Sequence, residues 1–161
     1  MELVKELKLC EAKILSPDNY RDPFDPYIAP IRLHIYSSGG YAFDAYFAVD
    51  QIRMLRVPVH TIVCGSGCSA ATILSCVGKR RFITKNAYML IHAPRIKLLT
   101  IPDVQIKQEH YNGIDYNAHL INHYVTYTKM SKESLEELFS MPDRYFNAEE
   151  CLEKGLVDEI I

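Results

Sequence analysis

Short apolar segments rich in β-prone residues alternate, from Ile31 to the end of the chain, with segments whose apolar residues recur at helical spacing. The first kind predicts strands at residues 31–36, 59–64, 81–84, 87–91, 144–146 and about 157–160. The second kind predicts helices at residues 42–56, 69–77, about 103–129, from 131 to the proline at 142, and 148–154. Strands that alternate with helices in this way predict an α/β fold whose parallel sheet is buried on both faces.

Two segments add detail to this pattern. Residues 16–30 are rich in Pro, Asp and Tyr and predict irregular backbone. In the long predicted helix, His119 and His123 lie four residues apart with Asp115 on the same face, and the glutamate of an H-E-x-x-H motif is missing, which favours an exposed polar stripe over a metal site. Four tyrosines of this helix predict packing against a partner or against the domain itself: Tyr111, Tyr116, Tyr124 and Tyr127.

Composition narrows the classes of protein to which the chain can belong. It has 161 residues and a net charge of −2, and it contains no block of Lys and Arg. We therefore expect a single domain over residues 1–161, with neither nucleic acid nor a membrane as partner. No apolar stretch is long enough to span a bilayer, and charges interrupt the first residues where a signal peptide would be apolar. A cytoplasmic location is the resulting expectation.

The five cysteines predict reduced thiols rather than a disulfide framework, because their number is odd and three lie in apolar segments. Cys64 and Cys68 could form half of a zinc site, but no second Cys/His pair follows at ligand spacing. We expect neither a metal nor a cofactor.

Candidate chemistry is concentrated where three predicted strands end. The segments are Ser37-Ser38-Gly39-Gly40, Gly65-Ser66-Gly67-Cys68-Ser69-Ala70-Ala71 and Ile91-His92-Ala93-Pro94. Because α/β folds place their reactive groups at strand ends, a glycine pair, a serine at a helix start and a histidine in these positions indicate an acyl-transfer site. A serine hydrolase is the leading hypothesis.

Ser69 is the best candidate for the nucleophile. It follows a glycine-containing turn and opens a buried helix, so the amide of Ala70 is placed to stabilise an oxyanion on a carbonyl that Ser69 attacks. Serine is also a good N-cap, and spacing alone leaves both interpretations open. The segment lacks the G-x-S-x-G pattern of α/β-hydrolases, and Ser66, between two glycines, is a secondary candidate.

His92 and Asp143 are the candidates for the other two members of a catalytic triad. His92 ends an apolar strand and precedes Ala93-Pro94, and it is either a general base or a core histidine bonded to backbone. Asp143 follows Pro142 between a helix and a strand, where it either orients the histidine or makes an ordinary turn. Neither residue decides the matter alone.

Taken together, these segments resemble the ClpP family of serine peptidases. Residues 35–40 are similar to I-N-S-P-G-G, residues 65–71 to G-x-A-A-S-M-G, and residues 89–94 to M-I-H-Q-P. Residues 143–150 resemble D-R-x-x-x-A-x-E-A, and residues 155–158 resemble the end of Y-G-L-V-D. The resemblance covers roughly residues 30–161 and keeps the order Ser, His, Asp.

The resemblance implies a ClpP/crotonase-like ββα superhelix with a C-terminal helical handle region. It implies that Ser69 is the nucleophile, His92 the general base and acid, and Asp143 the orienting carboxylate, with an oxyanion hole made by the amides of Gly39 and Ala70. It further implies a serine endopeptidase that cleaves unfolded polypeptides inside a chamber of self-assembled rings, stacked as two heptamers, with an AAA+ unfoldase as partner.

The chain also departs from the family pattern. Ser38 replaces the usual proline, residues 95–99 replace a glycine-rich strand, and residues 1–30 form a divergent, shortened region expected to lack the family's first amphipathic helix. Such a compact copy is consistent with a phage-type member. Two alternative functions stay open: a non-catalytic ring subunit that pairs with an active paralogue, and a crotonase-fold enzyme acting on acyl-CoA.

Overall fold

A computed structural model describes residues 2–16, 28–94 and 103–161, with side chains in the last range described from residue 113 onward. Six helices are found in these ranges: α1 Glu2–Ile14, α2 Ala42–Met54, α3 Ala70–Ser75, α4 Asp103–Tyr127, α5 Lys132–Ser140 and α6 Ala148–Glu153. Six strands accompany them: β1 Ile31–Ser37, β2 Val59–Cys68, β3 Arg80–Ile83, β4 Tyr88–Ile91, β5 Arg144–Phe146 and β6 Glu159–Ile160. The predicted α/β class and the order of elements from Ile31 onward are confirmed.

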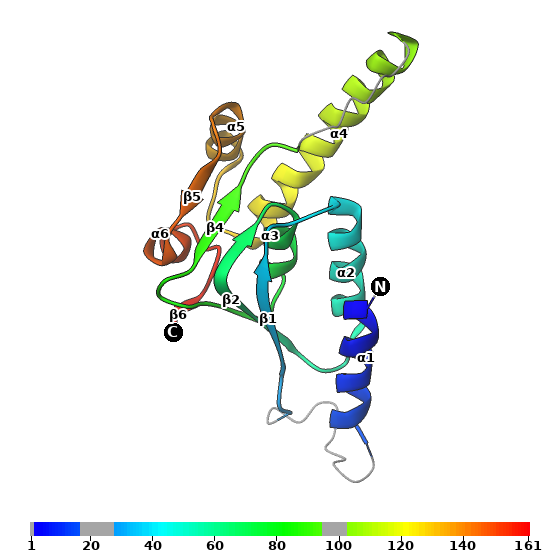
Figure 1. Cartoon of the computed structure of the whole chain (residues 1–161), viewed down its shortest axis with the longest axis vertical. Helices are drawn as coiled ribbons and strands as arrows, with labels where there is room; N and C mark the ends of the chain where they lie inside the picture. Colours follow the sequence, from blue (N-terminus) through cyan, green and yellow to red (C-terminus); the bar gives the residue numbers. More distant parts are fainter. Residues whose placement is uncertain (1, 17–27, 95–102) are drawn as a thin grey trace.

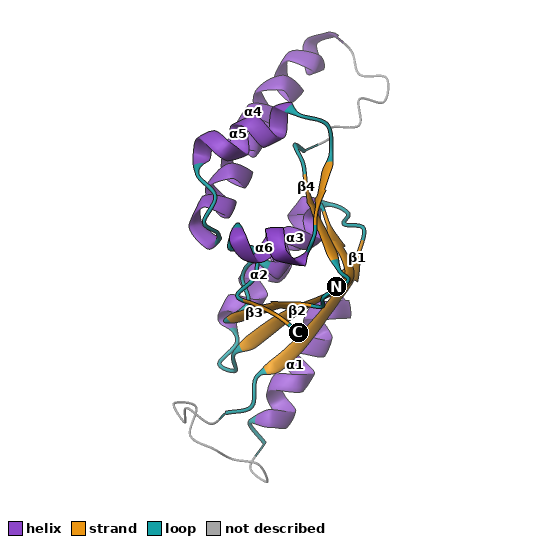
Figure 2. Cartoon of the chain, turned by 90° about the vertical axis from the view of Figure 1, so that its left-hand side faces the viewer, coloured by secondary structure: helices purple, strands orange, loops and turns teal. Residues whose placement is uncertain are grey.

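Strand β2 is the centre of the sheet (Figures 1 and 2). It pairs in parallel with β1 on one edge and with β3 and then β4 on the other, and β6 continues in parallel from β3. The consecutive residues Thr61, Ile62 and Val63 of β2 are all at most 1% exposed, as expected of a strand covered on both faces. The candidate residues Gly39, Ser69 and His92 follow the ends of β1, β2 and β4.

The expectation of a purely parallel sheet is wrong at β5, which pairs antiparallel with β4. The short connection 141–143 follows helix α5 and brings the chain back alongside β4 in the opposite direction. This reversal places the start of β5, which Asp143 precedes, opposite the end of β4.

Strand β2 is longer than the predicted 59–64. Its extension through Gly65-Ser66-Gly67 is held by two neighbours, since Ser37 of β1 pairs with Gly67 and Tyr88 of β4 pairs with Ser66. Glycine and serine have low intrinsic strand preference, so pairing with neighbouring strands overrides the local signal here.

The expectation that the N-terminal region lacks an amphipathic helix is also wrong, because α1 occupies Glu2–Ile14. Leu7 of this helix is buried in a small apolar cluster with Ile31 and Ile52, and α1 packs against α2. The apolar spacing that indicates this helix is present in the sequence: Leu3, Leu7, Cys10 and Ile14.

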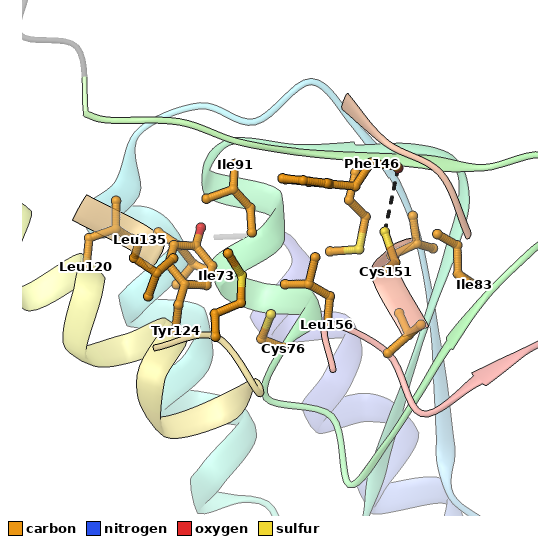
Figure 3. Packing of buried hydrophobic residues seen from close by; sticks show 14 of the residues in the cluster. Ile73, Cys76, Ile83, Ile91, Leu120, Tyr124, Leu135, Phe146, Cys151 and Leu156 are labelled. Atoms are coloured by element: carbon orange, nitrogen blue, oxygen red, sulfur yellow. Dashed lines mark hydrogen bonds between the residues drawn. The ribbon is translucent and has the colours of Figure 1, made fainter. Parts of the chain in front are cut away.

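The main core joins the sheet to the C-terminal helices (Figure 3). Ile73 of α3 and Cys76, which directly follows α3, pack there with Tyr124 of α4, Leu135 of α5 and Cys151 of α6, all of them at most 2% exposed. Beyond this core, α4 runs away from the sheet, and its N-terminal part extends past the rest of the fold (Figures 1 and 2). One end of α4 is therefore fixed inside the domain, and the other projects from it.

Candidate active site

The register of β2, β4 and β5 brings Ser69, His92 and Asp143 together where β2 and β4 end and β5 begins. Cys68 pairs with Leu90 in β2 and β4, so the next residue, Ser69, lies beside the end of β4. Ile91 of β4 pairs with Arg144 of β5, so His92, directly after β4, lies opposite Asp143, directly before β5. All three residues line the same cleft.

Ser69 has an unusual backbone conformation for a residue with a side chain. Its φ is 55° and its ψ is −125°, and no other non-glycine residue of the described ranges has a positive φ. Its amide donates a hydrogen bond to the carbonyl of Leu90 at 2.8 Å. Non-glycine residues in such sparsely populated conformations cost about 1–3 kcal/mol and cluster at active sites.

The N-cap interpretation of Ser69 does not account for its side chain. Ser69 occupies the position before α3, but its hydroxyl makes no capping hydrogen bond. Ser131 and Asn147, which precede α5 and α6, both accept such a bond from the helix. The Ser69 hydroxyl is therefore not committed to helix capping, which leaves it available for chemistry.

Gly39 closes the site from the side of β1. Its φ is +100°, and a Cβ built on it would lie 2.7 Å from both the Cys68 carbonyl oxygen and the Ser69 Cβ, and 3.1 Å from the Ala70 amide nitrogen. Only glycine permits so close an approach at this backbone angle. The two segments suggested for the oxyanion hole, one containing Gly39 and the other Ala70, are thus in direct contact.

The amide of Gly39 already has a hydrogen-bond partner, because it donates to the Ser37 hydroxyl oxygen at 3.1 Å. The next residue, Gly40, lines the cleft together with Ser69 and Ala70. A Cβ on Gly40 would meet no atom within 4 Å. In this segment the amide of Gly39 is therefore already hydrogen-bonded, whereas Gly40 borders the open space of the cleft.

His92 and Asp143 face each other across β4 and β5. The distance from His92 Nδ1 to Asp143 Oδ1 is 3.9 Å, which is longer than a hydrogen bond. The His92 side chain is 14% exposed, and its Nδ1 is buried without a hydrogen-bond partner among the described residues. A structural core histidine would be bonded to backbone, so this geometry favours a histidine whose partner closes in during the reaction, as catalytic hydrogen bonds often do.

The cleft has a volume of about 1040 Å³, which is ample for a stretch of polypeptide. Ile73 and Leu90 contribute apolar surface beside the nucleophile, and α4 supplies a wall that includes Tyr116 and Leu120. Tyr116 in turn packs against Phe43 of α2, with ring centres 5.7 Å apart and the rings tilted by 51°. The sequence predicted packing by Tyr116 and Tyr124 but not that they border a cleft; together with Leu120 they are spaced four residues apart on one face of the helix.

Ser66 and the five cysteines are the remaining candidates for chemistry. Ser66 lies inside β2, and the part of the chain with described side chains holds no cluster of three or more His, Cys, Asp or Glu that suits a metal ion. All five cysteines are free thiols, of which Cys68, Cys76 and Cys151 are buried. In the described residues, no helix has the length and apolar character needed to cross a membrane.

The expected exposed stripe on α4 is only partly correct, because His123 is buried. Its Nε2 lies 3.1 Å from the carbonyl oxygen of Ile73, and its ring packs against Tyr46 and Tyr127. His119 stays exposed and contacts Tyr46. Tyr46 of helix α2 covers this part of α4. The burial of His123 could not be predicted from the sequence, because histidine is a polar residue and the contact is tertiary.

Burial makes His123 a source of acid sensitivity. Loss of hydration lowers the pKa of His123 to about 4, helped by the nearby charges of Arg53 and His119 and opposed by the bond to the Ile73 carbonyl. Between pH 6.5 and pH 4, His123 is protonated in the unfolded chain but stays neutral in the folded protein. The free energy of unfolding therefore falls as the pH falls through this window. From about pH 7 to about pH 5 we expect this residue to cost about 2 kcal/mol of unfolding free energy.

Urea unfolding of the wild type and of His123→Gln at both pH values measures this effect. The variant should lose less stability on acidification than the wild type by that amount. Equal losses in the two proteins would show that His123 does not titrate in this way.

Comparison with known proteins shows the family of the chain. The Clp protease family model matches residues 25–161. The ATP-dependent Clp protease proteolytic subunit 1 of Chlamydia trachomatis serovar D is 36% identical over 136 residues, which cover 82% of this chain and 70% of the relative. The protein of the same name from Chlamydia muridarum is 37% identical over the same coverage, and that from Protochlamydia amoebophila is 35% identical over 142 residues, covering 82% of this chain and 65% of the relative. The chain therefore belongs to the Clp protease family and is a hydrolase of the protease class.

Proposed function

We propose that the chain is a serine endopeptidase that cleaves unfolded polypeptides through a triad of Ser69, His92 and Asp143. The observation that carries this proposal is the strand register, which brings the ends of β2 and β4 beside the start of β5, where the three residues line one cleft. The uncommitted hydroxyl of Ser69 and the unpartnered Nδ1 of His92 support it. Neither alternative function gains support from the relatives, which are named as proteolytic subunits.

The reaction follows from the roles of these groups. His92 removes the proton from the Ser69 hydroxyl as the oxygen attacks the peptide carbonyl carbon, and it then delivers that proton to the leaving amine. Water hydrolyses the resulting ester of Ser69 by the reverse sequence, with His92 again as base. Asp143 approaches Nδ1 of His92 from its present 3.9 Å, accepts that N–H and stabilises the imidazolium that forms during each step.

Two backbone amides are proposed to bind the oxyanion. One belongs to Ala70, directly after the nucleophile, and the other belongs to the Gly39–Gly40 segment. Gly39 serves in this role only if its amide releases the Ser37 hydroxyl oxygen, while Gly40 already borders the cleft. Each such donor typically contributes about 10²–10³-fold to the rate.

Assembly is the second part of the proposal. The Clp protease family generally forms oligomeric rings that work with AAA+ partners, and we propose a cytoplasmic ring of identical subunits, stacked as two heptamers, that receives chains from an unfoldase. Exposed apolar side chains on α1 and α2 support an interface between subunits, since they would be covered in a ring: Leu9, Phe43, Phe47 and Met54.

Two measurements on the purified chain test the proposal. Native mass spectrometry should find a ring, and the ring fraction should cleave a fluorogenic peptide and an unfolded casein, whereas Ser69→Ala should assemble equally and cleave neither. A ring that cleaves no substrate would favour a non-catalytic subunit, and a monomer that cleaves peptides would refute the chamber but keep the triad.

A further inference from the structure

We propose that Thr72 and Tyr124 form a hydrogen-bonded relay that positions the nucleophile and ties its geometry to helix α4. Thr72 lies in the first turn of α3 and is 0% exposed, while Tyr124 reaches in from α4 and is 1% exposed. Figure 3 shows Tyr124 entering the core beside Ile73 of α3. This inference rests on the proposed role of Ser69.

The direction of each hydrogen bond in the relay follows from the chemistry of the groups. The Thr72 hydroxyl lies 2.6 Å from the carbonyl oxygen of Ser69, which only accepts, so Thr72 donates its single proton there. The hydroxyl oxygens of Thr72 and Tyr124 are also 2.6 Å apart. Because the Thr72 proton is already used, Tyr124 must be the donor of this second bond, and the relay runs from Tyr124 through Thr72 to Ser69.

The relay acts on the strained residue itself. The amide of Ser69 is fixed by the Leu90 carbonyl on the strand side, and its carbonyl is fixed on the helix side by the amide and the hydroxyl of Thr72, at 2.9 Å and 2.6 Å. These two peptide groups flank the Cα of Ser69 and hold its φ of 55° and ψ of −125°. The direction of the Ser69 side chain depends on both angles.

A threonine that bonds back to the residue three positions earlier is common near helix starts. The Tyr124 hydroxyl is what sets this case apart. It is buried in the core and donates its hydrogen bond to the Thr72 hydroxyl oxygen. Removal of the Thr72 hydroxyl would therefore leave a buried donor without an acceptor. Since Tyr124 belongs to α4, whose other end projects from the domain, the relay connects that helix with the nucleophile.

Thr72→Val and Tyr124→Phe test the inference, with Thr72→Ser as the conservative variant. Thr61→Val is a matched control, because Thr61 is 1% exposed and its hydroxyl donates at 2.6 Å to the carbonyl of Ser75, at the other end of α3. The readouts are the second-order rate constant for labelling by an alkyl fluorophosphonate, kcat and KM for a fluorogenic peptide, and the melting temperature.

Thr72→Val should lower the labelling rate and kcat by about ten- to a hundredfold, because the nucleophile is displaced from its reactive position. KM should stay unchanged, because the substrate still binds as before. Tyr124→Phe should show the same pattern with a smaller loss, and Thr72→Ser should retain the wild-type rates. Thr61→Val should lower the melting temperature but label at the wild-type rate.

The outcomes separate this inference from the proposed function. If the wild type is labelled and Thr72→Val reacts as fast as Thr61→Val, the relay is structural only and the inference is overturned. If the assembled wild type is not labelled at all, the proposed function fails and the inference fails with it.

Discussion

Replacement of Ser69 by alanine should lower the peptidase rate by about 10⁶-fold while the fold and the assembly stay intact. The magnitude follows from the loss of the attacking oxygen, since serine peptidases that lose their nucleophile lose about this much of kcat. The stability should change little or improve, because the Ser69 hydroxyl makes no capping bond whose loss would weaken α3. Initial rates with a fluorogenic peptide, together with circular dichroism and native mass, measure both parts.

His92→Ala provides the matched comparison for this prediction. A base and a nucleophile that act as a unit show non-additive losses, so the double variant of Ser69 and His92 should be no slower than either single variant. Asp143→Asn should retain the fold and lose about 10⁴-fold, because the amide holds His92 in the wrong tautomer. Additive losses in the double variant would mean that the two residues do not act in one step.

Gly39→Ala should abolish activity and disrupt the turn that carries the nucleophile. The new Cβ would lie 2.7 Å from the Cys68 carbonyl oxygen and 2.7 Å from the Ser69 Cβ, and neither group belongs to a flexible side chain that can move away. We expect a loss of several kcal/mol of unfolding free energy from the overpacking and the positive φ together. Urea unfolding and fluorophosphonate labelling of the folded fraction measure the two effects.

Gly65→Ala separates the clash from the backbone strain. Gly65 also has a positive φ, of +70°, but its Cβ would meet only the ring of Tyr36 at 3.1 Å, and Tyr36 is 80% exposed and free to turn. This variant should lose about 1–2 kcal/mol of stability and keep its labelling rate. If Gly39→Ala loses no more stability than Gly65→Ala and is labelled at the same rate, the close contact between Gly39 and Ser69 does not contribute to activity.

The sequence predicted the fold class from Ile31 onward because periodicity and turn residues are strong there. It failed where tertiary contacts decide the outcome. The Gly65–Gly67 stretch lacks strand-forming side chains and becomes strand only because β1 and β4 pair with it. The resemblance to the family pattern predicts that an N-terminal helix is absent, whereas the regular apolar face that contains Leu7 indicates helix α1.

The candidate site shows the same division. Short motifs pointed to Ser69, His92 and Asp143, and the strand register brings these three into one cleft. The antiparallel pairing of β5 that aligns Asp143 with His92 could not be predicted, since it depends on how α4 and α5 return the chain to the sheet. Thr72 and Tyr124 lie 52 residues apart in sequence, so nothing local relates them.

The most direct test of the account is to locate the fluorophosphonate adduct on the assembled protein by peptide mass spectrometry. The account predicts a single adduct per chain on Ser69, which disappears in His92→Ala because the hydroxyl then keeps its proton. An adduct on Ser66 or another serine, or no adduct on protein that has folded and assembled, would contradict the assignment of Ser69 as the nucleophile.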